Sequence, residues 1–123
     1  MRTVQEAEKW VSEYAKEHGG RQQCIYGQCI EFSNDFKEWI GAGGAEIWGL
    51  FEVYDKGMSD KFPLVFKGNL KLPEGQDLSD VGWEIHEAVR WSGFWWDGYG
   101  KQSLSDIMTH FDTIKNPHWF RLE

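Results

Sequence analysis

Apolar and polar residues alternate along the middle of the chain, which is the pattern of β-strands with one face buried. The clearest alternation runs from Leu64 to Leu72, where Lys67 and Lys71 fall on the face opposite the leucines. The apolar face would contain Leu64, Phe66, Leu70 and Leu72. We therefore predict a strand over residues 64–72, with the leucines buried and the lysines in solvent.

Two neighbouring segments also have the character of strands. Ala45–Tyr54 has apolar residues at both even and odd positions, which predicts a central strand covered on both faces. Cys24–Phe32 predicts a further strand. Between them, Ser33–Ile40 fits either a short strand or a turn of helix capped by Ser33, and we expect the strand.

Apolar residues recur at helical spacing in three other segments. Thr3 and Glu6 form a capping-box pattern, which predicts a helix from about residue 4 to residue 18 that ends at Gly19–Gly20. Asp77 or Ser79 would cap a second helix that continues to a break at residues 97–100. The stripe of this second helix comprises Leu78, Val81, Ile85, Ala88 and Ser92.

The third predicted helix begins at Ser103 and ends before Asn116–Pro117, because the residue ahead of a proline disfavours helix. Its apolar face would be formed by Leu104, Ile107, Met108 and Phe111. Together these elements predict an α+β fold, an antiparallel three- to four-stranded meander packed by an N-terminal helix and two C-terminal helices. With 123 residues and no linker or repeat, the chain is expected to form a single α+β domain over residues 1–123.

The C-terminal part combines tryptophan with negative charge. Of the 8 tryptophans, four lie between Trp83 and Trp96, and residues 73–123 carry 4 basic and 9 acidic side chains. The adjacent Trp95 and Trp96 must diverge on a helix or a strand. We therefore expect at least one of these two rings to be exposed, close to at least two of Glu84, Glu87 and Asp97.

This segment is the candidate binding surface. Its residues are Trp83, Glu84, Glu87, Trp91, Trp95, Trp96, Asp97 and Tyr99. Acidic charge disfavours direct nucleic-acid binding and suits a protein partner with a basic surface. The favoured hypothesis is a non-enzymatic protein-interaction module, an inhibitor or immunity-type protein such as a phage counter-defence protein. Exposed aromatic rings would also allow a homodimer.

Two other functions stay open from the same residues. The tryptophans and Tyr99 could stack on a sugar or a nucleotide in a small-ligand site. Alternatively, Glu84, Glu87 or Asp97, or the histidines, could serve a small hydrolase, because a carboxyl group against indole can have a raised pKa. If the cluster is core instead, it would be covered by the last helix.

Other motifs give little support to catalysis. The glycines of residues 41–44 lack the Gly-Lys-Ser/Thr of a phosphate-binding loop. His86, His110, Asp112 and His118 are the candidates for a metal or hydrolytic site, but their spacing is not that of a zinc site. No Cys–His signature is recognised, so we expect no catalytic residue, metal or cofactor.

The cysteines and the N-terminus bear on location. On a continuous strand, Cys24 and Cys29 would lie roughly 16 Å apart on opposite faces and could not form a disulfide. A tight turn at residues 26–27 would instead place them opposite each other. No apolar run reaches about 18 residues and the N-terminus lacks a secretory leader, so we expect a cytoplasmic protein that does not enter a membrane.

Overall fold

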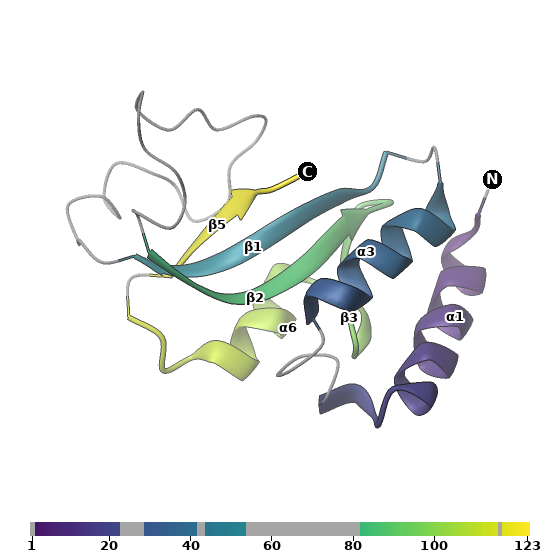
Figure 1. Cartoon of the computed structure of the whole chain (residues 1–123), viewed down its shortest axis with the longest axis horizontal. Coiled ribbons are helices and arrows are strands. Elements are labelled where there is room, and N and C mark those ends of the chain that lie inside the picture. The colour runs from purple at the N-terminus through teal and green to yellow at the C-terminus, as the bar shows by residue number, and fades with distance from the viewer. Residues whose placement is uncertain (1, 23–28, 42–43, 54–81, 116) are drawn as a thin grey trace.

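The computed structural model describes residues 2–22, 29–41, 44–53, 82–115 and 117–123. Its described part is an α+β fold built on a five-stranded antiparallel sheet with the strand order β4-β3-β2-β1-β5 (Figure 1). The strands are β1 (Glu46–Val53), β2 (Gly82–Trp91), β3 (Phe94–Asp97), β4 (Gly100–Gln102) and β5 (Pro117–Arg121). The helices are α1 (Val4–Glu17), α3 (Cys29–Ile40) and α6 (Leu104–Met108), the last followed by a 3₁₀ turn at Thr109–Phe111.

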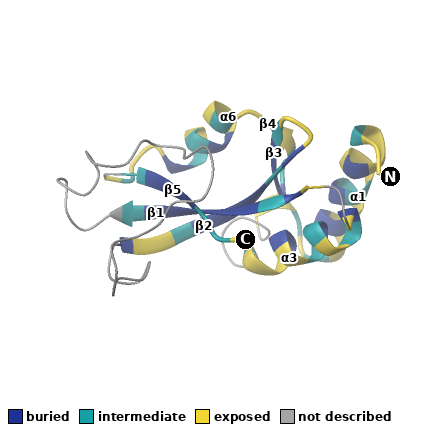
Figure 2. Ribbon diagram, turned by 90° about the horizontal axis from the view of Figure 1, so that it is seen from above, coloured by how far each residue is buried: buried dark blue, intermediate teal, exposed yellow. Residues whose placement is uncertain are grey.

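Helices cover both faces of the sheet, so the described residues form two hydrophobic cores (Figure 2). The first core lies between the sheet and the helices α1 and α3. The second core lies between the sheet and α6. Strand β1 contributes to both, because Ile47 enters the first core while Trp48 and Leu50 enter the second. The prediction of a central strand covered on both faces is therefore confirmed.

The predicted N-terminal helix is confirmed with its capping box. The hydroxyl of Thr3 accepts a hydrogen bond from the Glu6 backbone N–H, and the Glu6 carboxylate accepts one from the Thr3 N–H, both at 3.1 Å. Gly19 and Gly20 follow the helix with φ values of 88° and 103°, a backbone conformation that strongly favours glycine. Ser103 likewise caps α6, and Asp106 completes a second capping box there.

The strand expected over residues 24–32 and the short strand expected at 33–40 are wrong where the structure describes them. Residues 29–40 form the helix α3. Its buried residues Phe32, Phe36 and Ile40 recur every four positions, which is a helical period rather than the period of two that a strand requires. Residues 24–28 and the predicted strand at 64–72 lie outside the described residues.

The helix expected between Asp77 and residue 96 is also wrong over its described part, which forms the hairpin β2–β3. Ser92 and Gly93 have φ values of 54° and 80°, as the two central residues of a tight type I′ turn require. The apolar stripe that suggested a helix instead reflects a strand buried on both faces. This hairpin, together with β4 and the unpredicted β5, gives five strands rather than three to four.

Replacing Thr3 with alanine removes one half of the α1 capping box and should lower the free energy of unfolding by about 1 kcal/mol. Thr3→Ser keeps the hydroxyl acceptor and serves as the matched control. Urea unfolding followed by circular dichroism would measure both variants. Equal stability of Thr3→Ala and the wild type would mean that the box contributes nothing.

Trp96 is a second test of the fold, because it is fully buried between α3 and the sheet. Its ring lies 5.3 Å from that of Phe36, and its indole N–H donates to the Trp91 carbonyl at 3.0 Å. We expect Trp96→Ala to cost about 3–5 kcal/mol in unfolding free energy, and Trp96→Phe to cost less. A folded Trp96→Ala variant of unchanged stability would contradict this placement.

Candidate functional site

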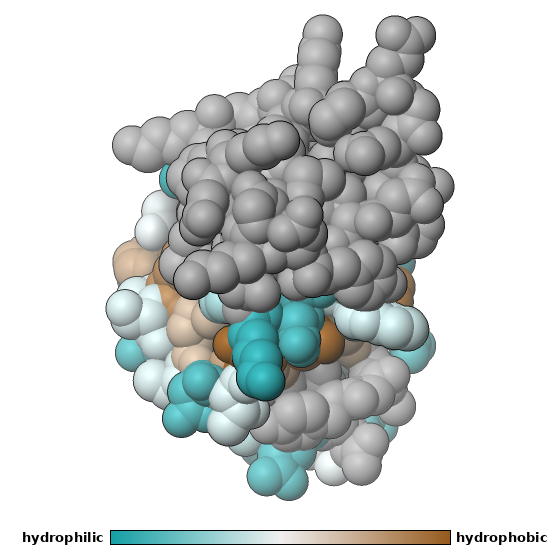
Figure 3. Space-filling model, turned by 90° about the vertical axis from the view of Figure 1, so that its left-hand side faces the viewer, coloured by the Kyte–Doolittle hydropathy of each residue, from teal (hydrophilic) through white to brown (hydrophobic). Residues whose placement is uncertain are grey.

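The candidate binding residues do not form one surface. Trp91, Trp95 and Trp96 are buried, as are Glu87 and Asp97, whereas Tyr99 is half-buried. Trp83 and Glu84 are exposed, and the exposed fraction of Trp83 is 65%. Their strand, β2, begins at the end of the molecule that faces the reader in Figure 3, where hydrophobic and hydrophilic described residues lie next to each other.

The expectation that Trp95 or Trp96 is exposed is wrong. The two rings do diverge, but each enters a different core, with Trp95 on the α6 side and Trp96 on the α1 and α3 side. Divergence implies exposure only if one face of the sheet is open to solvent. Here both faces are covered, so neither ring can be the exposed aromatic ringed by acids.

Asp97 instead belongs to a buried polar cluster at the end of β3. Its Oδ2 atom lies 3.1 Å from Nε2 of His86 on β2. Its Oδ1 atom accepts hydrogen bonds from the Tyr99 backbone N–H at 2.9 Å and from the Gln102 side-chain amide at 2.5 Å. Both carboxylate oxygens of this fully buried residue are thereby satisfied.

His86 is also fully buried, and aromatic rings fix its orientation. Its ring stacks on Phe111 at a centroid distance of 4.9 Å and lies edge-on to Trp119 at 6.4 Å. Since Nε2 faces Asp97, the nitrogen left for another group is Nδ1. Among the described residues, Nδ1 has no partner that meets the geometry of a hydrogen bond.

The half-buried thiol of Cys29, the first residue of α3, lies within interaction range of the His86 ring. Burial raises the pKa of this thiol. His86 and the backbone N–H of Glu87 lower the pKa by more than burial raises it, so the net pKa lies below the ordinary thiol value. The start of a helix adds partial positive charge, which favours a thiolate.

The shift at His86 is complementary. Burial alone would lower its pKa, but the hydrogen bond to Asp97, the nearby Cys29 thiol and the charges of both groups raise the pKa of His86 to about 9. A lowered pKa of the Cys29 thiol beside a raised pKa of the His86 imidazole favours a thiolate–imidazolium pair over two neutral groups. Cys29, His86 and Asp97 therefore follow one another as thiol, imidazole and carboxylate, the order of groups found in catalytic triads.

A pair of carboxyl groups borders this cluster. Burial, together with a hydrogen bond and the charge of Glu84, raises the pKa of Glu87 to about 8, and the charge of Cys29 adds to this. Glu87 lies opposite Gly49 in β1. A side chain at position 49 would approach the Phe51 ring to 2.8 Å and the Glu84 carboxylate to 3.4 Å. The absence of a side chain at Gly49 thus makes room for the Phe51 ring.

The sequence predicted Asp97 as a binding residue and His86 only as a candidate for a metal or hydrolytic site, and Cys29 was not predicted as a functional residue. The pattern that could have indicated this cluster is a cysteine followed later in the chain by a histidine and an aspartate. It went unused because Cys29 was assigned to a strand and His86 to a helix. The other histidine candidates lie elsewhere, since His110 stacks on Tyr99 at 4.6 Å and His118 is buried in β5. Within the described ranges, no three potential metal ligands come together.

Comparison with known protein families, curated proteins and solved structures gave no match to this chain. In the part of the chain that the structure describes, no helix has the length and apolar character needed to cross a membrane. The geometry of the cluster is therefore the basis on which its function can be argued.

The role of Asp97 predicts the titration of His86. Asp97→Asn keeps the size of the side chain but removes its charge, so the pKa of His86 should fall from about 9 toward the ordinary histidine value. A proton NMR titration of the His86 ring would measure this shift. Asp112→Asn, at an exposed aspartate in the turn after α6, is the matched control and should leave the His86 titration unchanged. An unaltered titration in Asp97→Asn would exclude Asp97 as the orienting group.

Proposed function

We propose that the protein is a cysteine-dependent acyl-transfer enzyme, in which the Cys29 thiolate attacks the carbonyl carbon of an amide, ester or thioester. The observation that carries this proposal is the convergence of Cys29, His86 and Asp97 from three separate elements, with both partners of the thiol fully buried. Structural cysteines in apolar surroundings have raised pKa values and are inert, whereas the pKa of Cys29 is lowered.

The proposed reaction divides the work among the three residues. The sulfur of Cys29 forms a bond to the substrate carbonyl carbon as the bond from that carbon to the leaving nitrogen, oxygen or sulfur breaks. The imidazolium of His86 gives its proton to the leaving amine, alcohol or thiol. This leaves a thioester on Cys29 and a neutral imidazole. His86 then removes a proton from water, which attacks the thioester and releases the carboxylic acid and the thiolate. Asp97 holds the ring and stabilises its charged form.

The surroundings of the thiol fit this chemistry. His86 and Asp97 are fully buried, so the half-buried sulfur is the member of the triad that a substrate can reach. The exposed Ile30, with an exposed fraction of 52%, follows the nucleophile directly and offers apolar contact beside it. The first-turn N–H groups of a helix have no acceptor within that helix, and they supply the kind of donor that an oxyanion requires.

This proposal replaces the interaction hypothesis as the better supported one. The exposed Trp95 or Trp96 from which an inhibitor or counter-defence role was argued is buried, as are the rings of the suggested stacking pocket other than Trp83 and the half-buried Tyr99. The present proposal is closer to the small-hydrolase alternative, but its nucleophile is the thiolate of Cys29 and not a carboxylate.

Alkylation of Cys29 would test the nucleophile directly. In a Cys24→Ala variant, Cys29 is the only thiol, and its reaction with iodoacetamide can be followed by intact mass. We expect alkylation to stay rapid at pH values below the ordinary thiol pKa, because His86 lowers the pKa of Cys29. Adding His86→Gln should slow alkylation at neutral pH by about tenfold or more, because the thiol then regains a higher pKa.

Acyl transfer itself has its own pH signature. With an activated acyl ester of low leaving-group pKa, Cys24→Ala should form a thioester on Cys29 that Cys29→Ala lacks. With an amide, turnover should rise as Cys29 ionises and fall above about pH 9, where His86 loses the proton that the leaving amine needs. Alkylation and acylation rates indifferent to His86 would refute the proposal.

A further inference from the structure

A second site lies away from Cys29, where α1 meets the end of α3. Four rings stack in sequence there: Trp39 on Trp10 at 5.5 Å, Trp10 on Tyr14 at 4.9 Å, and Tyr14 on His18 at 3.8 Å between centroids. The interplanar angles are 24°, 24° and 13°. We name these four residues the ring stack. Trp10, Trp39 and His18 are half-buried, so the stack borders solvent along the helix.

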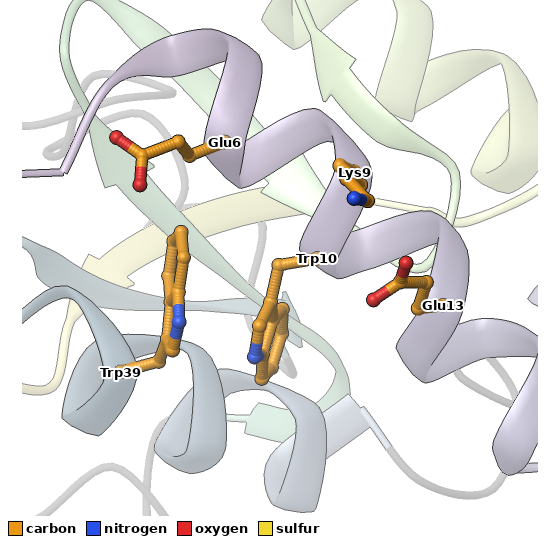
Figure 4. Close-up of a pocket in the computed structure, with 5 residues that line it drawn as sticks. All are labelled: Glu6, Lys9, Trp10, Glu13 and Trp39. Atoms are coloured by element: carbon orange, nitrogen blue, oxygen red, sulfur yellow. The ribbon is translucent and has the colours of Figure 1, made fainter.

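A groove follows the ring stack, and its wall is acidic. Its larger part has a volume of about 300 Å³ and is lined by Glu6, Lys9, Trp10, Glu13 and Trp39 (Figure 4). An adjoining hollow of about 120 Å³ shares Trp10 and Glu13 and adds Tyr14 and Glu17. Three carboxylates thus face one ammonium group along the groove. Among the described residues, none of these three carboxylates forms an ion pair.

The protein's own Arg2 contacts Trp39, one of the two tryptophans that line this groove. Its guanidinium lies 4.3 Å from the ring centroid of Trp39, and its Nε donates a hydrogen bond to the Trp39 carbonyl at 3.1 Å. Ring face and carbonyl acceptor are the two contacts that favour a planar guanidinium over an ammonium. Trp39 therefore already accepts a guanidinium, and the groove that this ring lines also presents carboxylates that form no ion pair among the described residues.

We propose that this groove binds an extended, arginine-containing segment of a partner protein. Glu6 and Glu13 are two helical turns apart, a separation of about 10 Å along the axis of α1. A polyproline II segment has three residues per turn and rises about 3.1 Å per residue, so its side chains three positions apart lie on one side at a similar spacing. Arginines at every third position can then meet the two carboxylates while their stems contact the tryptophans.

This site is separate from the candidate binding surface inferred from the sequence, which consisted of residues 83–99. Like that predicted surface, the groove is acidic and aromatic and suits a basic partner, but its residues are Glu6, Trp10, Glu13 and Trp39. It does not depend on the acyl-transfer proposal. A Cys29→Ala variant should bind the partner segment as the wild type does, so the two proposals can fail independently.

The test uses a synthetic peptide with arginine at every third position, separated by prolines, and a matched peptide with glutamine in place of arginine. Nitrogen-15 NMR would follow the indole N–H signals of Trp10 and Trp39 during titration. We expect the arginine peptide to shift these two signals in a saturable and salt-sensitive manner, and the glutamine peptide to leave them unchanged.

Two charge reversals make the result specific. Glu13→Lys places a cation in the groove and should weaken binding by about tenfold. Asp112→Lys makes the same change in net charge at an exposed position after α6, on the opposite face of the sheet, and should change affinity less than about twofold. No saturable shift of Trp10 and Trp39, or equal losses in the two variants, would overturn the proposal, since the latter would mean that only net charge attracts the peptide.

Discussion

The burial of the Asp97 carboxylate is the constraint on which the candidate site depends. A carboxylate removed from water is very costly unless it is paired and hydrogen-bonded. Here the cost is offset by His86, by the Tyr99 backbone N–H and by the Gln102 amide, which come from β2, the β3–β4 turn and β4. Three consecutive strands must therefore be in register before this carboxylate can be buried. The same interactions leave one side of the imidazole for Cys29.

The two-sided packing of the sheet makes this arrangement rigid. On the α6 side, Phe111 and Trp119 hold the His86 ring. On the other side, α3 packs through Phe32 and Phe36 and presents Cys29 at its first residue. Cys29 and His86 are thus positioned by different cores. A site supported from both faces of a sheet has little freedom to lose its geometry, which a nucleophile and base held in position require.

Local signals in the sequence predicted local structure well. The Thr3–Glu6 box, the Ser103 cap and the doubly apolar strand at 45–54 are all confirmed, because each depends on residues within a few positions of one another. The prediction of a helix over residues 82–91 was wrong because their apolar residues fit both the helical period and a strand buried on both faces. Residues 82–91 carry apolar groups at helical spacing by coincidence, and the turn at Ser92–Gly93 that makes them a hairpin is only two residues long.

The candidate site required those errors to be corrected, because its residues meet only through tertiary structure. Fifty-seven positions separate Cys29 from His86, and the assignments of the first to a strand and the second to a helix left no reason to bring them together. The cluster of tryptophans attracted attention for its size, yet the rings of Trp95 and Trp96 serve the two cores and not a surface. Their position still led close to the site, because the carboxylate that directly follows them, Asp97, is fully buried. A buried carboxylate demands a partner, and that demand is a better guide to chemistry in this chain than the aromatic residues that surround it.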